Sequence, residues 1–171
     1  MAWVRCCGAK SGKTISVDLS SLSFAQPSNT SAGPNVKRTF TKGTYCLGLS
    51  DDNQFYPSYV NLVSRNGNTV TIKGVTYGGY GFGYVLPNTV EPNKLVTVKF
   101  TKDNNCRLVV CNYKSDGTFL NSTIISGANE TAGTYTKTFS LPSNAEYGIL
   151  LLYSGTLNVN TVLTLESIVT E

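Results

Sequence analysis

The segment from Asn93 to Tyr153 decides the fold class. It begins Asn93-Lys94-Leu95-Val96-Thr97-Val98-Lys99-Phe100-Thr101, and four more short runs follow, at 107–113, 118–125, 134–142 and 147–153. Each run is rich in β-branched and aromatic residues, and Gly, Pro, Asn or Asp residues separate one run from the next. This pattern is typical of consecutive antiparallel strands.

The first run alternates with a period of two. Val96, Val98 and Phe100 fall on one side of the predicted strand, and Thr97 and Lys99 fall on the other. Such alternation indicates a sheet with one buried face. We therefore expect Val96, Val98 and Phe100 in the core, together with Leu151 and Leu163.

The composition is that of one weakly charged globular domain. The 171 residues are 40% hydrophobic and 14% charged, against about 25% charged residues in an average domain. Serine, threonine, asparagine and glycine fill the polar positions, which is common in extracellular and virion β-proteins. The chain has no histidine, the usual proton carrier in catalysis. Because the candidate carboxylates fall in predicted loops or turns, we expect no enzymatic activity; they are Glu91, Asp116, Glu130 and Glu146.

Residues 1–35 differ from the rest of the chain. The whole chain has a net charge of +4, and its basic character is concentrated in residues 1–43, which carry six basic side chains and one acidic side chain. Residues 20–35 have the composition of a linker. We predict two parts, an arm and linker over residues 1–35 and a sandwich over residues 36–171. The residues expected to anchor the arm in an assembly are Trp3, Val4, Arg5, Lys10 and Lys13. The alternative is that residues 14–19 form a strand of the chain's own sandwich, with Ile15 and Val17 buried.

Five cysteines are an unfavourable number for disulfides, and two of them, Cys6 and Cys7, are adjacent. Cys106 and Cys111 lie five residues apart on one predicted strand, so their side chains should point to opposite faces. Without histidine or C-x-x-C spacing we expect neither a disulfide nor a zinc site. Free thiols fit synthesis in a reducing cytoplasm. We recognise no signal peptide and no apolar run of membrane-spanning length, so we expect no membrane insertion.

Turn signals recur about every ten residues from residue 36 onward. They separate predicted strands at 37–41, 44–49, 59–64, 68–73, 75–86 and 161–169, and Asn66-Gly67 is a strong hairpin signal. With the runs quoted above this gives about ten strands and no helix. The fold class is therefore all-β, an antiparallel sandwich of the jelly-roll type. Residues 51–54 could offer oxygen ligands to calcium, but an exposed loop is the favoured interpretation.

Aromatic residues and glycines alternate between Val75 and Leu86. Tyr80, Phe82 and Tyr84 share one face of the predicted strand, opposite a row of three glycines. The favoured interpretation is that the rings fill the core while the glycines make room for a crossing loop. The other is an aromatic platform for a sugar. Its candidate residues are Tyr77, Tyr80, Tyr84, Asn112 and Tyr113, with Tyr153 as a further tyrosine.

The passage from Val90 to Phe100 resembles one found in jelly-roll carbohydrate-binding modules, and residues 134–139, 145–151 and 162–168 resemble their last three strands. The resemblance covers residues 36–170. It implies glycan binding on a sheet face or at loop tips through aromatic side chains. Similar modules occur in phage tail, fibre and capsid-decoration proteins. The chain departs from the family's frequent calcium ligand, since Asn158, Asn160 and Thr161 stand near that position, and we expect no cofactor.

These observations predict a non-catalytic, virion-associated protein that displays a carbohydrate-binding sandwich on its N-terminal arm. Such a protein would be a phage decoration, fibre or tail accessory protein, located in the virion and oligomeric or part of a larger assembly. Its expected partners are other virion proteins, through residues 1–35, and a cell-surface glycan, but no nucleic acid. The alternative is a free-standing glycan-binding module of a bacterial surface or secreted protein.

Overall fold

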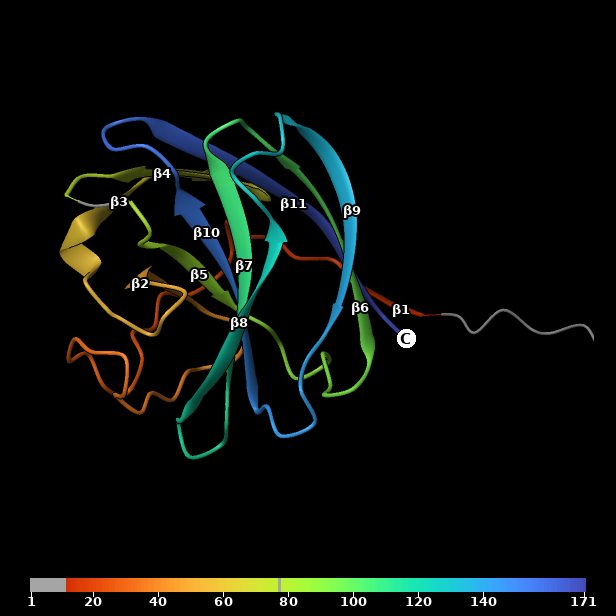
Figure 1. Ribbon diagram of the computed structural model, residues 1–171. Coiled ribbons are helices and arrows are strands. Elements are labelled where there is room, and N and C mark those ends of the chain that lie inside the picture. Colours follow the sequence, from red (N-terminus) through yellow and green to blue (C-terminus); the bar gives the residue numbers. More distant parts are fainter. Residues whose placement is uncertain (1–11, 77) are drawn as a thin grey trace, which may run out of the picture.

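The computed structural model describes residues 12–76 and 78–171, which form two sheets packed face to face (Figure 1). The first sheet contains β1 (Lys13–Ile15), β3 (Val60–Asn66), β4 (Thr69–Gly74), β6 (Leu95–Lys102), β9 (Gly133–Ser140) and β11 (Asn160–Thr170). The second sheet contains β2 (Tyr45–Leu49), β5 (Gly81–Val85), β7 (Cys106–Tyr113), β8 (Phe119–Ser126) and β10 (Tyr147–Ser154). A short 3-10 helix, η1 (Pro57–Tyr59), precedes β3.

The order of the strands is that of a jelly-roll sandwich. The first sheet runs β3-β4-β11-β6-β9, with β1 also paired to β11, and the second runs β2-β5-β10-β7-β8. Every pairing between these strands is antiparallel. The predicted all-β sandwich is therefore confirmed, with eleven strands among the described residues where about ten were expected. None of the described residues form a helix that is long and apolar enough to span a bilayer.

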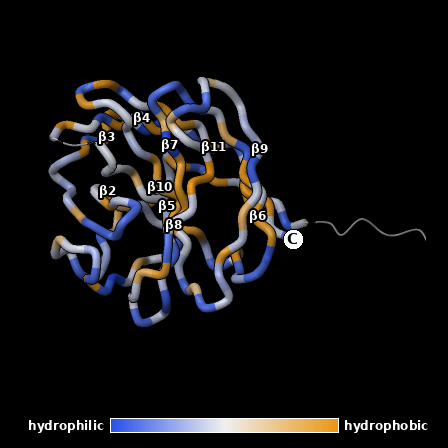
Figure 2. The backbone as a smooth tube through the Cα atoms, in the orientation of Figure 1, coloured by the Kyte–Doolittle hydropathy of each residue, from blue (hydrophilic) through white to orange (hydrophobic). Residues whose placement is uncertain are grey.

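The main core lies between the two sheets, where Figure 2 shows hydrophobic stretches along the inner strands. Val96, Val98 and Phe100 are fully buried there, and Leu163 joins them. The alternation predicted for β6 is thus confirmed. Leu151 is also buried, but its side chain lies on the opposite face of the second sheet.

That opposite face carries a second core, because two loops cover it. We call residues 28–44 and 50–56, on either side of β2, the covering loops. Phe40 and Phe55 from these loops pack with side chains of β7 and β10. Arg38 is fully buried among them: its guanidinium donates to Asn53 Oδ1 at 3.1 Å and to the carbonyl oxygens of Asn29, Ser31 and Asn53. In the second sheet β2, β5, β7 and β10 are consequently buried on both faces, whereas the edge strand β8 stays largely exposed.

The predicted division at residue 35 is wrong for the described part of the arm. β1 pairs with β11, in the register Lys13 with Thr170 and Ile15 with Ile168. Val17 and Leu19 are 3% and 1% exposed and belong to the main core. The alternative, a strand that completes the chain's own sandwich, agrees with this packing, although Ile15 is only partly buried. Residues 20–35 are not a free linker either, since Ala25 N donates to Tyr45 O at 2.9 Å.

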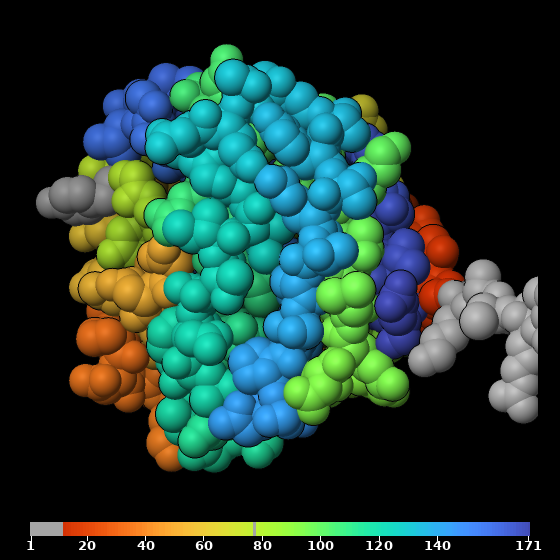
Figure 3. Space-filling view, turned by 45° about the vertical axis from the view of Figure 1, so that its right-hand side comes forward, coloured from red at the N-terminus to blue at the C-terminus, as the bar shows by residue number. Residues whose placement is uncertain are grey.

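Four of the five predicted anchor residues, Trp3, Val4, Arg5 and Lys10, lie outside the described residues, so the anchoring role stays a prediction. Lys13 is exposed at the start of β1. Figure 3 shows the N-terminal residues in red directly against the dark blue C-terminal residues on one side of the molecule. Both ends of the described chain therefore lie at the same place.

Two predicted strands differ from the observed ones. Residues 37–41 form no strand, because Arg38 and Phe40 turn inward from a covering loop. The strand predicted over residues 75–86 is limited to β5, residues 81–85. The hairpin at Asn66-Gly67 is confirmed, with Gly67 at φ +55° between β3 and β4. Cys106 and Cys111 are free and face the main and second cores, respectively, as expected.

Candidate functional site

The structure does not bring the predicted sugar-binding residues together on a surface. Tyr84 is 5% exposed and lies in the main core, whereas Tyr113 is fully buried in the second core and donates through its hydroxyl to Asn53 Oδ1 at 2.8 Å. Asn112 is buried and donates to Asn121 Oδ1 at 2.8 Å. Tyr77 lies outside the described residues. The prediction of a platform that includes Tyr84, Asn112 and Tyr113 is therefore wrong.

The physical reason is that β5 and β7 are covered on both faces, so no ring on them reaches solvent. The glycines of β5 allow close packing of neighbouring groups. A Cβ atom on Gly81 would lie 1.7 Å from the carbonyl oxygen of Leu152 on β10, so only glycine fits there. The favoured interpretation is thus correct for the rings of Phe82 and Tyr84, but the glycine row accommodates β10 and the Cys46 side chain instead of a crossing loop.

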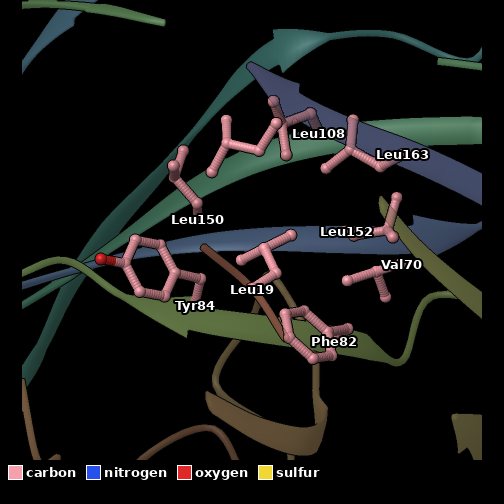
Figure 4. A pocket seen from close by; sticks show the side chains of 9 residues that line it. Leu19, Val70, Phe82, Tyr84, Leu108, Leu150, Leu152 and Leu163 are labelled. Atoms are coloured by element: carbon pink, nitrogen blue, oxygen red, sulfur yellow. The ribbon is translucent and has the colours of Figure 1, made fainter. Parts of the chain in front are cut away.

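The apolar space between the sheets is not a ligand site. Figure 4 shows Leu19, Val70, Phe82 and Tyr84 pointing toward one another there, with leucines of β7, β10 and β11. The remaining cavity has a volume of about 10 Å³. A volume of this size holds at most one water, and an apolar lining leaves it dry. These side chains are core.

A different group of tyrosines lies at one end of the second sheet. Tyr56 and Tyr59 stack with their ring centroids 4.8 Å apart, and Tyr80 meets them edge-on at 5.5 and 5.2 Å. Tyr56, Tyr59 and Tyr80 are all half-buried. We call them the tyrosine trio. They pack the loop before β5 against η1, because Tyr80 belongs to the loop, Tyr56 precedes the helix and Tyr59 is its last residue.

The same loop forms one wall of a surface hollow of about 350 Å³. The end of β10, the start of β7 and the loop after β8 form the other walls. The residues that line it are Gly78, Gly79, Arg107, Ala128, Tyr153, Ser154 and Gly155. A volume of this size is at the lower end of the range of about 300–1,000 Å³ for small-molecule sites.

Arg107 is the charged side chain of the hollow, and its guanidinium is held in place. It donates to Asp51 Oδ2 at 2.9 Å and lies over the Tyr153 ring at 5.5 Å from the centroid. The side chains of this ion pair are about one third exposed, 34% for Arg107 and 29% for Asp51. Among the described residues this is the sole hydrogen bond of the guanidinium, so further N–H donors are available.

Tyr153 is buried beneath this ion pair. Its hydroxyl has no hydrogen-bond partner of normal geometry in the described part of the chain, although the Asp51 carboxylate is close enough to influence it. Burial, the Cys111 thiol and the Asp51 carboxylate all raise the pKa of Tyr153 above its ordinary value. The hydroxyl therefore keeps its proton over the whole physiological range.

The polar loop over residues 51–54, a conceivable calcium site by sequence, has its side chains engaged by protein groups. Asp51 pairs with Arg107, Asp52 accepts from Ser50 and Gln54, and Asn53 binds Arg38 and Tyr113. Within residues 12–76 and 78–171 no three His, Cys, Asp or Glu side chains are grouped as metal ligands would be.

Four residues of this site were not predicted from the sequence: Tyr56, Tyr59, Arg107 and Asp51. The signal available was the sequence Tyr56-Pro57-Ser58-Tyr59, two aromatic residues around a proline in a segment between strands. Arg107 had no such signal, since its neighbours come from loops distant in sequence.

No protein-family model matches the chain, and no curated protein matches it by sequence. Solved structures are similar in fold. The CBM22-1 and GH10 modules of xylanase 10B from Clostridium thermocellum, complexed with xylohexaose, match 66% of this chain with 13% identity and a TM-score of 0.51. The CBM22-1 xylan-binding domain of Paenibacillus barcinonensis Xyn10C matches 65% of this chain and 78% of its own length, with 13% identity and a TM-score of 0.48.

A tailspike protein of bacteriophage CBA120 matches 65% of this chain and 15% of its own length, with 14% identity and a TM-score of 0.39. This chain spans about a quarter of the xylanase structure, 24%. At these identities the likeness establishes the fold alone. The described chain thus has the jelly-roll sandwich of carbohydrate-binding modules, as its sequence predicted.

Proposed function

We propose that this protein is a non-catalytic glycan-binding module whose site is the hollow at the loop end of the second sheet. The observation that carries the proposal is that one hollow combines glycine backbone with the guanidinium of Arg107, which the Asp51 carboxylate holds in place. Tyr80 of the tyrosine trio follows Gly79 of the lining directly in the chain. Sugar hydroxyls both donate and accept hydrogen bonds, and a paired Arg107 and Asp51 offer both functions side by side. Tyrosine rings add apolar contact for the C–H faces of a sugar.

The carboxylates of the described chain support a non-catalytic role. A glycosidase uses two carboxyl groups across the scissile bond, one protonated and one ionised. Here five acidic side chains form ion pairs with lysine or arginine at 2.5–2.9 Å: Asp51, Asp116, Glu130, Glu146 and Glu166. The lysine partners lower the pKa of Asp116, Glu130 and Glu166, so these carboxyl groups are poor proton donors.

Binding of the purified chain to a glycan array, followed by calorimetry on each positive glycan, tests the proposal. Flat tyrosine sites without tryptophan should give dissociation constants between about micromolar and millimolar. Arg107→Met should weaken binding at least tenfold, because the donors of the hollow are lost. Lys94→Met removes one positive charge at the far end of the molecule and serves as the control. A blank array, or equal affinities of Arg107→Met and wild type, would refute the proposal.

We propose the virion as the place where this module works, presented by an arm over its first residues to other virion proteins. The weakly charged polar surface and the position of the site support display away from an attachment point. β11 runs 11 residues from the hollow, where Thr161 binds Ser154, to its pairing with β1. At about 3.3 Å per residue these two places are about 33 Å apart.

Quantitative mass spectrometry of purified particles tests the setting. A virion component should be present at a fixed ratio to the major capsid protein and should survive stringent washing. Its absence from particles, with the protein on cells or in the medium, would favour the alternative of a bacterial surface or secreted glycan-binding module.

A further inference from the structure

The central strands of the second sheet offer no open outward surface to a glycan chain. The covering loops bury the outward face over β7 and β10, where Val109, Cys111, Ile149 and Leu151 are all 0% exposed, and only the edge strand β8 stays open, with Ile124 56% exposed. The loops are fastened by buried polar contacts, since Arg38 N donates to Gly117 O at 2.7 Å and Arg38 also binds Asn53. A ligand would have to displace a hydrophobic core to reach this face.

The outward face of the first sheet is open but lacks rings. On β6 and β9 it presents Thr97, Lys99, Thr101, Thr134, Thr136 and Thr138, opposite the inward Val98 and Phe100. The aromatic residues of these two strands, Phe100, Tyr135 and Phe139, face the main core or pack against it. Long saccharides bound along a sheet need apolar ring faces under several successive sugar units, and this face offers none.

The hollow, in contrast, is short and walled by loops on several sides. Its walls come from residues 78–79, from Arg107, from Ala128 and from residues 153–155. A volume of about 350 Å³ admits a small ligand, not an extended one. A hollow of this size suits one or two sugar units, so we expect it to hold the end of a chain.

The charges around the hollow distinguish uncharged sugars from acidic ones. The charge of Arg107 is already balanced by Asp51 at 2.9 Å. Asp52 is exposed next to it in the chain and its hydrogen-bond partners, Ser50 and Gln54, are uncharged. Asp52 is thus an unbalanced negative charge one residue from Asp51, and it disfavours a further carboxylate close to the Arg107–Asp51 ion pair.

We infer that the hollow is a chain-end site for an uncharged saccharide: it binds the terminal unit of a neutral glycan, with Arg107 and Asp51 bridging neighbouring hydroxyls. This inference rests on the proposed glycan-binding function and narrows its ligand class. It also makes Gly78 a specificity-determining position, because any side chain there would occupy the hollow.

Gly78→Leu is the variant that tests the site. A Cβ atom on Gly78 would meet the Ser154 carbonyl oxygen at 3.4 Å, an ordinary contact, so the fold should tolerate it. The matched control is Thr138→Leu, which adds an apolar side chain on the exposed face of β9. Melting temperatures of both variants, taken first, should be within a few degrees of wild type.

The ligands are matched series made from the glycan that gives the strongest signal on the array: its terminal mono- and disaccharide, its hexasaccharide, and the disaccharide with its terminal primary hydroxyl oxidised to a carboxylate. We expect the disaccharide to bind within about tenfold of the hexasaccharide, and the oxidised form to bind at least tenfold more weakly. Gly78→Leu should lose at least tenfold in affinity while Thr138→Leu is unchanged. Asp52→Asn should reduce the difference in affinity between the neutral and the oxidised disaccharide.

The outcomes distinguish failure of the proposed glycan-binding function from failure of the chain-end site. If no glycan binds, the proposed function fails and the inference with it. If glycans bind but affinity rises a hundredfold or more from disaccharide to hexasaccharide, or Gly78→Leu binds like wild type, the chain-end site is wrong while glycan binding stands. If the oxidised disaccharide binds as well as the neutral one, the selection for uncharged sugars is wrong.

Discussion

Arg38 is the largest fully buried side chain of the described chain, and it has no carboxylate partner there. Its guanidinium is satisfied by three backbone carbonyls and the Asn53 side chain, and it lies 5.3 Å from the centre of the Phe55 ring. It holds the covering loops together from inside. A charge buried in this way is tolerated only while every donor is paired.

Replacement of Arg38 by leucine should lower the free energy of unfolding by about 3–5 kcal/mol, because several buried carbonyls lose their donor. Urea denaturation measures this. Lys37→Met is the control: Lys37 forms an exposed ion pair with Asp116 at 2.7 Å, and its loss should cost less than about 1 kcal/mol. Equal losses for the two variants would contradict the assigned role of Arg38.

The three described thiols should be unreactive in the folded protein. Burial raises the pKa of the Cys46 thiol to about 12 and holds those of Cys106 and Cys111 well above their ordinary value. In a Cys6→Ser/Cys7→Ser variant, a thiol reagent at pH 8 should therefore label no cysteine in buffer and three in denaturing urea. Rapid labelling in buffer, or fewer than three sites in urea under non-reducing conditions, would contradict the expected free, buried state.

The same pKa shifts predict a loss of stability at alkaline pH. Thiols in the unfolded chain ionise above pH 9.0, the ordinary value, while Cys46 in the folded chain stays protonated until about pH 12. A pKa raised by folding contributes stability below the unfolded value, and this contribution is lost as pH rises through the folded value. The melting temperature should fall above about pH 9, and less steeply in Cys46→Ala.

At the scale of elements, β1 and the residues after it belong to the sandwich. Leu19 is 1% exposed and closes the space between the sheets that Figure 4 shows. Leu19→Ala should cost about 2–5 kcal/mol of unfolding free energy, the usual range for a leucine deleted from a core. Calorimetry measures the unfolding free energy of this variant and of the exposed control Ser21→Ala, and the loss should be clearly larger for Leu19→Ala. A loss below about 1 kcal/mol for Leu19→Ala would mean that residues 13–19 are a dispensable arm after all.

The sequence predicted the strands that are buried on one face. It did not predict which strands are buried on both faces, nor the loops that cover them. In β6 polar and apolar residues alternate, so the period of two alone assigns Val96, Val98 and Phe100 to the core. β7 is buried on both faces, and periodicity alone cannot say that Tyr113 is covered. What covers it is a loop whose buried residues, Arg38 and Phe40, follow no strand period that would have marked them as core.

The candidate site was predictable only in part, for a related reason. Tyr80 was identified from its place in the aromatic and glycine repeat, but its partners Tyr56 and Tyr59 come from a segment more than 20 residues earlier. The ion pair of Arg107 with Asp51 joins residues 56 positions apart. Such contacts depend on which strand ends meet at one edge of the sheet, and that order follows from the three-dimensional topology.

In the whole molecule, β1 with the C-terminus and the hollow lie at opposite ends of β11. Figure 1 shows β1 and the C-terminus on one side, with η1 and the loop before β5 on the other. Fusion of a folded protein to the C-terminus should therefore change glycan affinity by less than about twofold. Calorimetry with the array-selected glycan measures this. Insertion of the same partner into residues 155–160, the exposed loop beside the hollow, should reduce affinity at least tenfold.

The pairing of β1 with the last residues of β11 also determines how the module responds to a pulling force. Lys13 lies opposite Thr170, so tension between the two ends of the chain acts across one end of a short antiparallel ladder. The backbone hydrogen bonds then open one after another, as in a zipper, instead of resisting together. A module held through both ends would release β1 at low force and draw Val17 and Leu19 out of the core, whereas one held through a single end would transmit the pull without unravelling.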